Sequence, residues 1–390
     1  MIQKKGKKIT LAIVGMLVAI ASITIIPNLT FIRRLLTYPE DPITNTDWYQ
    51  PLITVPGNPK ELTQVSQQRN NSISQDSLNK ISNYAEANNS SALLVLHRKK
   101  LVLERYWSGF TADSTFNSMS MSKTIVSLLI GIAIAEGDIK SELEPVASYI
   151  PEWSDDERGK ITIRDLLYMQ SGLRNSDNTD NPLSDLVRMY GGKDANALAI
   201  NIPAVSEPQQ VFSYNNANTQ ILGRVLSTAT DKSYVNYLST KLWQPIQAGE
   251  AYLWLDRPGG NPKLFCCLFA TPRDWAKVGQ LFIDRGRVNN KQVVAANWLD
   301  KMSRASLLEP KYGYYIWLKA RTDSKNEAYD VTSSRPFLTT DTFYLDGASR
   351  QRVYVIPSLE LVIVRVGESS QTWDDSVIPN TLIGDLQNIR

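Results

Sequence analysis

The sequence predicts an α/β fold of the α+β type, with one mixed β-sheet closed by both ends of the chain and a mostly helical lobe inserted in the middle. Three observations support this fold class. Two apolar-rich runs on either side of residue 100 are joined by a short basic turn, which is typical of a β-hairpin. Four strand-like runs follow residue 311, and the periodic segments between these two regions mostly have helical spacing.

The first 30 residues are expected to form a membrane anchor or a signal segment. Lysines at positions 4, 5, 7 and 8 precede an uncharged, mostly apolar run of 18 residues, Ile9–Ile26. As a helix this run would span about 27 Å, close to the thickness of a hydrocarbon core. The lysines favour an N-terminus inside the cell and export of the rest of the chain. We expect an uncleaved anchor, and the alternative is cleavage near Ala19–Ala21 to give a secreted or periplasmic protein.

The rest of the chain divides into a tether and one folded domain. Residues 31–75 are rich in Pro, Asn, Gln and Thr and indicate a tether with a few residues draped on the domain. Residues 76–390 are expected to form the domain, with the helical insert at about 160–300. Helices are predicted at about 76–88, 124–135, 163–171, 218–228, 234–242, 272–285 and 378–389. Strands are predicted at 92–96, 101–107, 312–318, 343–345, 351–356 and 361–366.

The composition excludes several functional classes. The chain is 43% hydrophobic and 21% charged, as in ordinary globular proteins, and its net charge of +3 comes from the four N-terminal lysines. The remainder has 38 basic and 39 acidic residues, so no nucleic-acid-binding face is expected. The single histidine, His97, falls in the hairpin turn, which disfavours a Ser-His-Asp triad. A zinc site is not expected, because the only other soft ligands are Cys266 and Cys267, which we interpret as small buried apolar residues because neighbouring cysteines seldom form a disulfide.

The most apolar predicted helix opens with Ser120-Met-Ser-Lys123. Because residues 124–135 are apolar on nearly every side, this helix should be buried, and Lys123 in its first turn should have a lowered pKa. Ser120 lies three residues earlier on the same face, so we predict a nucleophile beside a general base. The backbone N–H of Ser120 would contribute to an oxyanion hole. A second copy of the pattern, Ser77–Lys80, lies in a polar segment and is interpreted as a solvated helix face.

A second proton carrier is suggested by Tyr214-Asn-Asn216, which follows a turn-rich stretch and precedes a predicted helix. Beside a lysine ammonium, the Tyr214 phenol would have a depressed pKa and could pass a proton between nucleophile and leaving group. Asn216 could hold the lysine or a substrate carbonyl by hydrogen bonds. The alternative is that Tyr214 is a half-buried aromatic side chain without a chemical role.

These motifs, in this order, resemble those of the β-lactamase and penicillin-binding-protein-like serine hydrolase superfamily. The resemblance covers about residues 76–390 and is to the class C-related branch, which includes esterases and 6-aminohexanoate-dimer hydrolase. Ser120–Lys123 is similar to the family's SxxK motif, Tyr214–Asn216 to its YxN motif, and residues 162–173 and 271–279 to further family segments. The resemblance implies an antiparallel β-sheet flanked by helices, and an acyl-enzyme formed with Lys123 and Tyr214 as acid/base partners, without a cofactor.

The family's third motif, Lys-Thr-Gly on an edge strand, has no copy in this chain. Its nearest counterpart is Leu345-Asp-Gly-Ala348. Gly347 would let a substrate approach the backbone closely. The N–H of Ala348, or that of Ser349 if the register is shifted by one residue, would complete the oxyanion hole.

Two carboxylates bear on the charge of the substrate. Asp346 would repel a substrate carboxylate, which disfavours β-lactam and D-Ala-D-Ala substrates and favours a neutral or amine-bearing ester or amide, although Arg350 or Arg352 could compensate. Ser184-Asp185 is similar to a segment near the substrate pocket of the dimer-hydrolase branch, where a carboxylate could bind a substrate amine. The alternative is that Asp185 is a solvated or helix-capping residue.

The sequence therefore predicts a membrane-anchored hydrolase whose catalytic domain lies outside the cytoplasm and cleaves small ester or amide substrates. Its expected partners are a small-molecule or peptide-like substrate and, through the N-terminal segment, the membrane. Neither a nucleic acid nor a metal ion is expected. Two alternatives remain open, a D-Ala-D-Ala carboxypeptidase or β-lactamase, and a non-catalytic relative that binds components of the cell envelope.

Overall fold

The structure is a computed structural model that describes residues 28–62, 73–323 and 331–388. The apolar run Ile9–Ile26, predicted to be an anchor or signal, lies outside these ranges. Among the described residues, one helix has the length and apolar composition to cross a bilayer, Met119–Glu136. Because 78% of it is buried inside the protein, it is a core helix of the domain.

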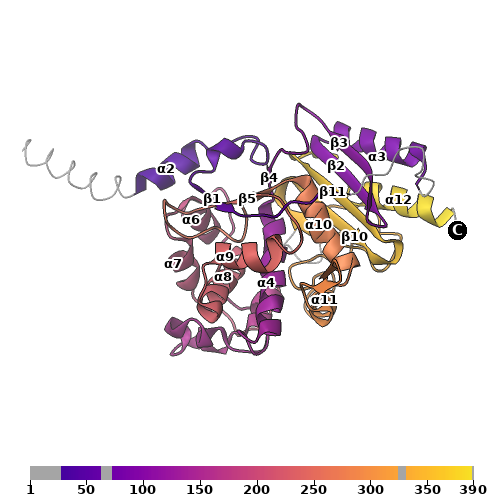
Figure 1. Cartoon of the computed structure of the whole chain (residues 1–390). Helices are drawn as coiled ribbons and strands as arrows, with labels where there is room; N and C mark the ends of the chain where they lie inside the picture. Colours follow the sequence, from indigo (N-terminus) through magenta and orange to yellow (C-terminus); the bar gives the residue numbers. More distant parts are fainter. Residues whose placement is uncertain (1–27, 63–72, 324–330, 389–390) are drawn as a thin grey trace, which may run out of the picture.

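A five-stranded antiparallel sheet is formed by strands from both ends of the described chain, in the order β3–β2–β11–β10–β9 (Figure 1). The strands are β2 (Ser90–His97), β3 (Lys100–Tyr106), β9 (Phe343–Gly347), β10 (Gln351–Ile356) and β11 (Leu361–Gly367). The predicted hairpin and the last three predicted strands are confirmed, but every pairing is antiparallel, so the prediction of a mixed sheet is wrong. The predicted strand 312–318 is a turn with isolated bridges, because Tyr315 has a left-handed φ of 61°.

Helices cover both faces of this sheet, which explains why its central strands are continuous apolar runs and not alternating ones. Helix α10 (Pro272–Ile283) packs on β10 and β11, whereas α3 (Gln75–Ala87) and α12 (Val377–Asn388) lie together beyond β2 (Figure 1). Gly279 allows α10 to approach the sheet closely, because a Cβ at this position would lie 2.5 Å from a methyl group of Val362.

A second sheet, which the sequence patterns do not predict, has the strand order β1–β5–β6–β4. Its strands are β1 (Leu52–Val55), β4 (Phe116–Asn117), β5 (Ala251–Trp254) and β6 (Leu268–Ala270). Pairing of β1 with β5 holds part of the expected tether against the folded chain, and helix α2 (Leu29–Leu36) packs on α6. Residues 28–55 therefore contact the domain extensively, and the term tether does not describe them.

The helical lobe is built around α4 (Ser122–Glu136), which is buried from Ser122 to Ala133 and ends at Gly137 with a left-handed φ of 86°. Helix α8 packs directly against α4. The other elements are α5 (Ile163–Leu167), α6 (Asp185–Gly191), α7 (Ala195–Ile200), α8 (Asn216–Thr230), α9 (Tyr234–Leu238) with a π-helical extension (Ser239–Trp243), β7 (Arg287–Val288), β8 (Lys291–Gln292) and α11 (Ala296–Met302).

Candidate active site

Ser120 lies in a tight turn between the second sheet and the buried helix α4. Strand β4 ends at Asn117, and the N–H of Ser118 donates to the carbonyl of Leu268 at 3.0 Å, which fixes the start of the turn. Met119 has a left-handed φ of 47°, and its N–H donates to the side chain of Asn117 at 3.0 Å. A non-glycine residue in this region costs of order 1–3 kcal/mol, so the surrounding contacts must hold it in place. The turn presents the partly exposed Ser120 at a pocket, two residues before the buried helix begins at Ser122.

The amine of Lys123 is the centre of the site. Its Nζ lies 2.8 Å from Ser120 Oγ, 2.7 Å from Asn216 Oδ1 and 2.7 Å from the carbonyl oxygen of Phe265. The carbonyl oxygens of Asn216 and Phe265 can only accept hydrogen bonds, whereas the serine hydroxyl can also donate. A neutral amine therefore donates to these two oxygens and directs its lone pair at the proton of Ser120. This is the arrangement that a general base requires.

Burial makes Lys123 suitable for this role at neutral pH. Only 1% of its surface is exposed. Desolvation lowers its pKa from the ordinary value of 10.5 to about 7, and the negative charge of Asp346 opposes this shift by raising the pKa. About half of the amine is therefore neutral at pH 7.

Tyr214 completes the group around the nucleophile. Its ring centroid lies 5.1 Å from Lys123 Nζ, and its ring packs against Tyr312 and Trp317, which also contact each other. The pKa of the phenol is raised, mainly by burial and further by Asp346, which is opposite to the direction expected from the sequence. Desolvation dominates because the phenol is buried, and the nearby amine opposes it only weakly since about half of it is uncharged at pH 7. Tyr214 thus keeps its proton and is suited to act as an acid or a relay.

The counterpart of the third motif lies beside the nucleophile turn. A Cβ at Gly347 would lie 2.4 Å from the carbonyl oxygen of Ser118, so the glycine allows β9 to pack against the chain that precedes Ser120. The group that approaches the backbone closely at Gly347 is therefore the chain at Ser118, whereas the sequence analysis expected a substrate there. Ala348 and Ser349 follow at the end of β9 and line the same pocket as Ser120, so both candidates for the second oxyanion donor reach the site.

The charge of Asp346 is compensated by arginines. Its carboxylate contacts the guanidinium of Arg352 and lies 3.3 Å from that of Arg321. Arg352 also binds Asp375 through two hydrogen bonds of 2.8 and 2.9 Å, and neither of these two side chains is exposed. Arg352 is therefore engaged within the protein and does not face a substrate, and Arg350 does not line the pocket. The charge of Asp346 is neutralised by its arginine partners, so its repulsion of a substrate carboxylate is reduced.

The pocket in front of Ser120 has a volume of about 460 Å³ and mostly apolar walls. Its walls come from the N-terminal segment, from α6, from the loop at Phe265–Cys266 and from the residues after β9. Ser120 and Asn216 provide the polar groups at the catalytic end. A pocket of this size, largely apolar with a few convergent polar groups, fits a small-molecule substrate.

Cys266 and Cys267 form a disulfide in the structure, which contradicts their interpretation as small apolar residues. Cys267 has a left-handed φ of 74°, and this turn allows neighbouring side chains to meet. Cys266 lines the pocket, and the preceding residue, Phe265, supplies the carbonyl that binds Lys123. The disulfide therefore belongs to the loop that holds the amine of Lys123.

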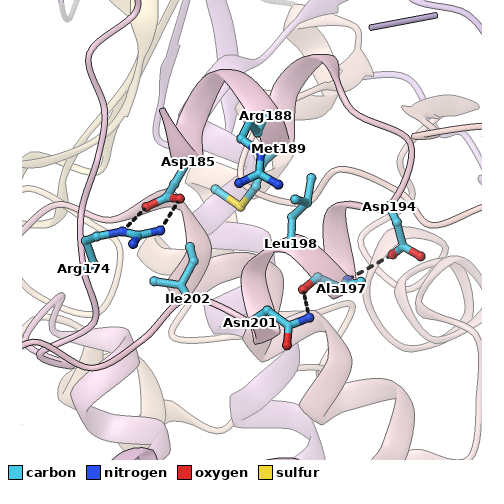
Figure 2. Close-up of a pocket in the computed structure, with 9 residues that line it drawn as sticks. All are labelled: Arg174, Asp185, Arg188, Met189, Asp194, Ala197, Leu198, Asn201 and Ile202. Atoms are coloured by element: carbon cyan, nitrogen blue, oxygen red, sulfur yellow. Dashed lines mark hydrogen bonds and ion pairs between the residues drawn. The ribbon is translucent and has the colours of Figure 1, made fainter. Parts of the chain in front are cut away.

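Asp185 does not reach this pocket. Its carboxylate binds Arg174 through two hydrogen bonds of 2.9 and 2.8 Å and lines a separate cavity of about 270 Å³ (Figure 2). Helix α6 separates the two spaces, because Leu186 and Tyr190 face the Ser120 pocket whereas Asp185 faces the other cavity. Ser184 caps the N-terminus of α6. Asp185 itself is buried and paired with Arg174, so it is neither a solvated residue nor the helix cap.

The remaining candidates for other chemistries lie outside the site. His97 ends β2 in the five-stranded sheet and does not line the pocket. Within residues 28–62, 73–323 and 331–388, no group of three or more histidine, cysteine, aspartate or glutamate side chains is arranged to hold a metal ion.

Two contributors to the site were not predicted from the sequence. The carbonyl of Phe265 is a backbone group and has no residue-type signature. The N-terminal wall of the pocket comes from a segment whose composition indicates a tether. A sequence clue to that wall is the group of aromatic residues Tyr38, Trp48 and Tyr49, which is unusual for a solvated linker.

Two known proteins are similar to part of this chain in sequence. The 6-aminohexanoate-dimer hydrolase of Paenarthrobacter ureafaciens is 27% identical over 227 residues, which are 55% of this chain and 57% of that protein. The protein Flp of Staphylococcus aureus is 25% identical over 138 residues, which are 33% of this chain and 26% of that protein. The match therefore covers little more than half the length of the first relative and about a quarter of the second.

Solved structures share the fold at lower identity. A Bacillus anthracis structure with the provisional name 6-aminohexanoate-dimer hydrolase has a TM-score of 0.67 at 21% identity and covers 91% of this chain and 94% of its own. A family VIII carboxylesterase has a TM-score of 0.59 at 15% identity, with 80% and 96% covered. The octameric penicillin-binding protein homologue of Pyrococcus abyssi has a TM-score of 0.60 at 17% identity, with 80% and 77% covered. The family model described as Beta-lactamase matches residues 79–386, most of the chain, and this protein therefore belongs to the β-lactamase family.

Proposed function

We propose that this protein is a serine hydrolase that cleaves small ester or amide substrates through an acyl-enzyme on Ser120. The observation that carries the proposal is the environment of Lys123, a buried amine with a pKa of about 7, placed 2.8 Å from Ser120 Oγ and held by two oxygens that can only accept hydrogen bonds. Relatives named as a 6-aminohexanoate-dimer hydrolase and a carboxylesterase support an amide- or ester-cleaving activity.

The proposed reaction follows from the groups that meet at Ser120. The neutral amine of Lys123 takes the hydroxyl proton while Oγ attacks the substrate carbonyl. The N–H groups of Ser120 and Ala348 stabilise the oxyanion. Tyr214 donates its proton to the leaving group and regains one from the Lys123 ammonium. Water then attacks the acyl-enzyme, with the proton transfers in reverse, and releases the acid.

The surroundings of the site favour a neutral substrate. The third motif lacks the lysine that the family uses to bind a substrate carboxylate, and the arginines nearest to Asp346 are engaged within the protein. The pocket walls are mostly apolar. These observations favour ester or amide substrates over β-lactams and D-Ala-D-Ala peptides.

We further propose that residues 1–30 anchor the enzyme in the cytoplasmic membrane with the catalytic domain outside. This proposal rests on the lysines followed by the apolar run Ile9–Ile26. Fractionation of cells that produce the full chain tests it: the enzyme should be in the membrane fraction and should be degraded by protease added outside the membrane. Recovery in the soluble cytoplasmic fraction would contradict this location.

Labelling with a fluorophosphonate probe tests the catalytic proposal. The wild-type chain and Ser77→Ala should be labelled, and Ser120→Ala should not. Ser77 is a matched control because it heads the second Ser-x-x-Lys pattern, on the surface helix α3. A panel of p-nitrophenyl esters, amino-acid amides and a chromogenic cephalosporin then defines the substrate class. Unchanged labelling of Ser120→Ala would disprove Ser120 as nucleophile, and turnover of the cephalosporin alone would favour a β-lactamase.

A further inference from the structure

The N-terminal segment between Leu29 and Trp48 forms one wall of the catalytic pocket. Five residues of this segment line the pocket that also contains Ser120 and Asn216, and they are Arg34, Leu35, Tyr38, Pro42 and Trp48. The family match begins only at residue 79. The wall therefore comes from a part of the chain that precedes the region matched by the family model.

A buried arginine fixes the wall in position. Arg34 is 4% exposed, and its guanidinium lies 4.6 Å from the ring centroid of Trp254. Its two terminal nitrogens donate to five backbone carbonyls from three parts of the chain, at 2.9–3.4 Å. These carbonyls belong to Gln50, Gly191, Gly192, Leu255 and Asp256. A lysine has three donors on one nitrogen and could not reproduce this fork.

Close packing also holds the N-terminal wall in position. A Cβ at Gly191 of α6 would lie 2.8 Å from the ring of Phe31, so α2 rests directly on α6. The ring centroid of Tyr38 lies 5.5 Å from that of Trp48 and 5.9 Å from that of Tyr190 on α6. Trp48 in turn packs on Trp254 at 5.4 Å. The wall is thus a packed aromatic surface that the core supports on its far side.

The chemistry of this wall defines what it can bind. Leu35, Tyr38 and Trp48 offer apolar surface, and Leu186 and Tyr190 of α6 line the same pocket. Among the five residues of the segment that line the pocket, only Arg34 is charged, and its guanidinium is already held by backbone carbonyls. Apolar surface without a free charge selects bulky apolar groups, since each methylene removed from water gains up to about fourfold in binding.

We propose that the segment Leu29–Trp48 is a specificity wall that holds a bulky apolar group of the substrate, such as a medium-length acyl chain or an aromatic ring, next to Ser120. The inference rests on the proposed hydrolase function and adds the class of ester or amide that the site prefers. Leu35 and Trp48 are specificity-determining residues, and Arg34 is a positioning residue.

Two neighbouring leucines allow a matched test with the full-length chain. Leu35 lines the pocket, whereas Leu36, the next residue of the same helix, is 81% exposed and does not line it. Values of kcat/KM are measured for p-nitrophenyl acetate, butyrate and octanoate, and for acetate esters of alcohols of increasing length, with wild type, Leu35→Ala, Trp48→Ala and Leu36→Ala. Thermal unfolding shows whether each variant is folded.

Wild type and Leu36→Ala should prefer the longest substrate of at least one series over the shortest by ~10-fold or more. Leu35→Ala and Trp48→Ala should lose most of this preference, because kcat/KM should fall far more for the longest substrate than for the acetate. Arg34→Lys should raise KM for the long substrate with little change in kcat. An unchanged chain-length ratio in both variants, or equal losses for short and long substrates, would overturn the inference. Labelling of Ser120 by a small fluorophosphonate separates the two proposals, because a labelled enzyme without chain-length preference disproves only the wall, whereas an unlabelled wild type disproves the hydrolase function as well.

Discussion

The rate of acylation of Ser120 should follow the deprotonation of Lys123, with a midpoint near pH 7. Burial lowers the pKa of this amine from 10.5 to about 7, which corresponds to about 5 kcal/mol against its charged form. About half of the base is then active at pH 7, and about 1% at pH 5, so the rate should fall roughly 50-fold between these values. An ordinary lysine would be only ~0.03% neutral at pH 7, and its rate would still be rising at pH 10.

The measurement is the second-order rate constant for labelling by a fluorophosphonate between pH 5 and 10 at constant ionic strength, because it reports ionisation in the free enzyme. The rate should rise about tenfold per pH unit below pH 6.5 and level off above about pH 8. The only histidine, His97, lies in β2 away from the pocket, so His97→Gln should give the same midpoint. A rate that continues to rise above pH 9, or one that is independent of pH, would refute the assignment of Lys123 as a low-pKa base.

Three further predictions concern the same group of residues. The free energy of unfolding of Lys123→Met, minus that of wild type, should fall by about 4 kcal/mol between pH 6 and pH 10 in denaturant titrations. The sign follows because the lowered pKa in the folded state destabilises the wild type by the full amount below pH 7, where the lysine is protonated in both states. This penalty decreases as the pH rises from 7 to 10.5, the range in which only the folded lysine has lost its proton; a constant difference would contradict it. Tyr214→Phe should lower kcat/KM for esters by ~10²–10⁴-fold with little change in melting temperature, since only the proton-carrying hydroxyl is removed, and near wild-type turnover would exclude a proton-transfer role. Gly347→Ala should cost about 1–3 kcal/mol in stability and slow labelling, because its Cβ would meet the Ser118 carbonyl at 2.4 Å, and a variant as stable and reactive as wild type would contradict this packing.

The parts of the site that are local in the sequence could be predicted from it. The Ser120–Lys123 spacing places both side chains on one helix face, and the apolar run after it predicts the burial that lowers the lysine pKa. The sheet strands were also predictable, because β10 and β11 are long apolar runs separated by a turn. In these cases, residues close in the chain decide the structure.

What could not be predicted depends on contacts between distant segments. Strand β4 has two residues and β6 has three, so neither shows a period, and only the pairing of β6 with β4 and β5 defines them. Arg34 looks like a linker residue until its carbonyl partners are known. The direction of the Tyr214 pKa depends on how much of the phenol is desolvated, and the likeness of Ser184-Asp185 to a family segment cannot distinguish a helix cap from a substrate ligand.

The antiparallel pairing of β2 with β11 has a consequence for how the protein matures. Arg365 of β11 donates to the hydroxyl of Ser90, 275 positions earlier in the chain, so the centre of the main sheet joins its earliest and latest strands. During synthesis the β2–β3 hairpin has no neighbour on its inner edge until nearly the whole polypeptide has left the ribosome. A chain that stops before residue 361 would leave this apolar edge open to other molecules, and early termination should therefore give aggregates and no smaller active enzyme.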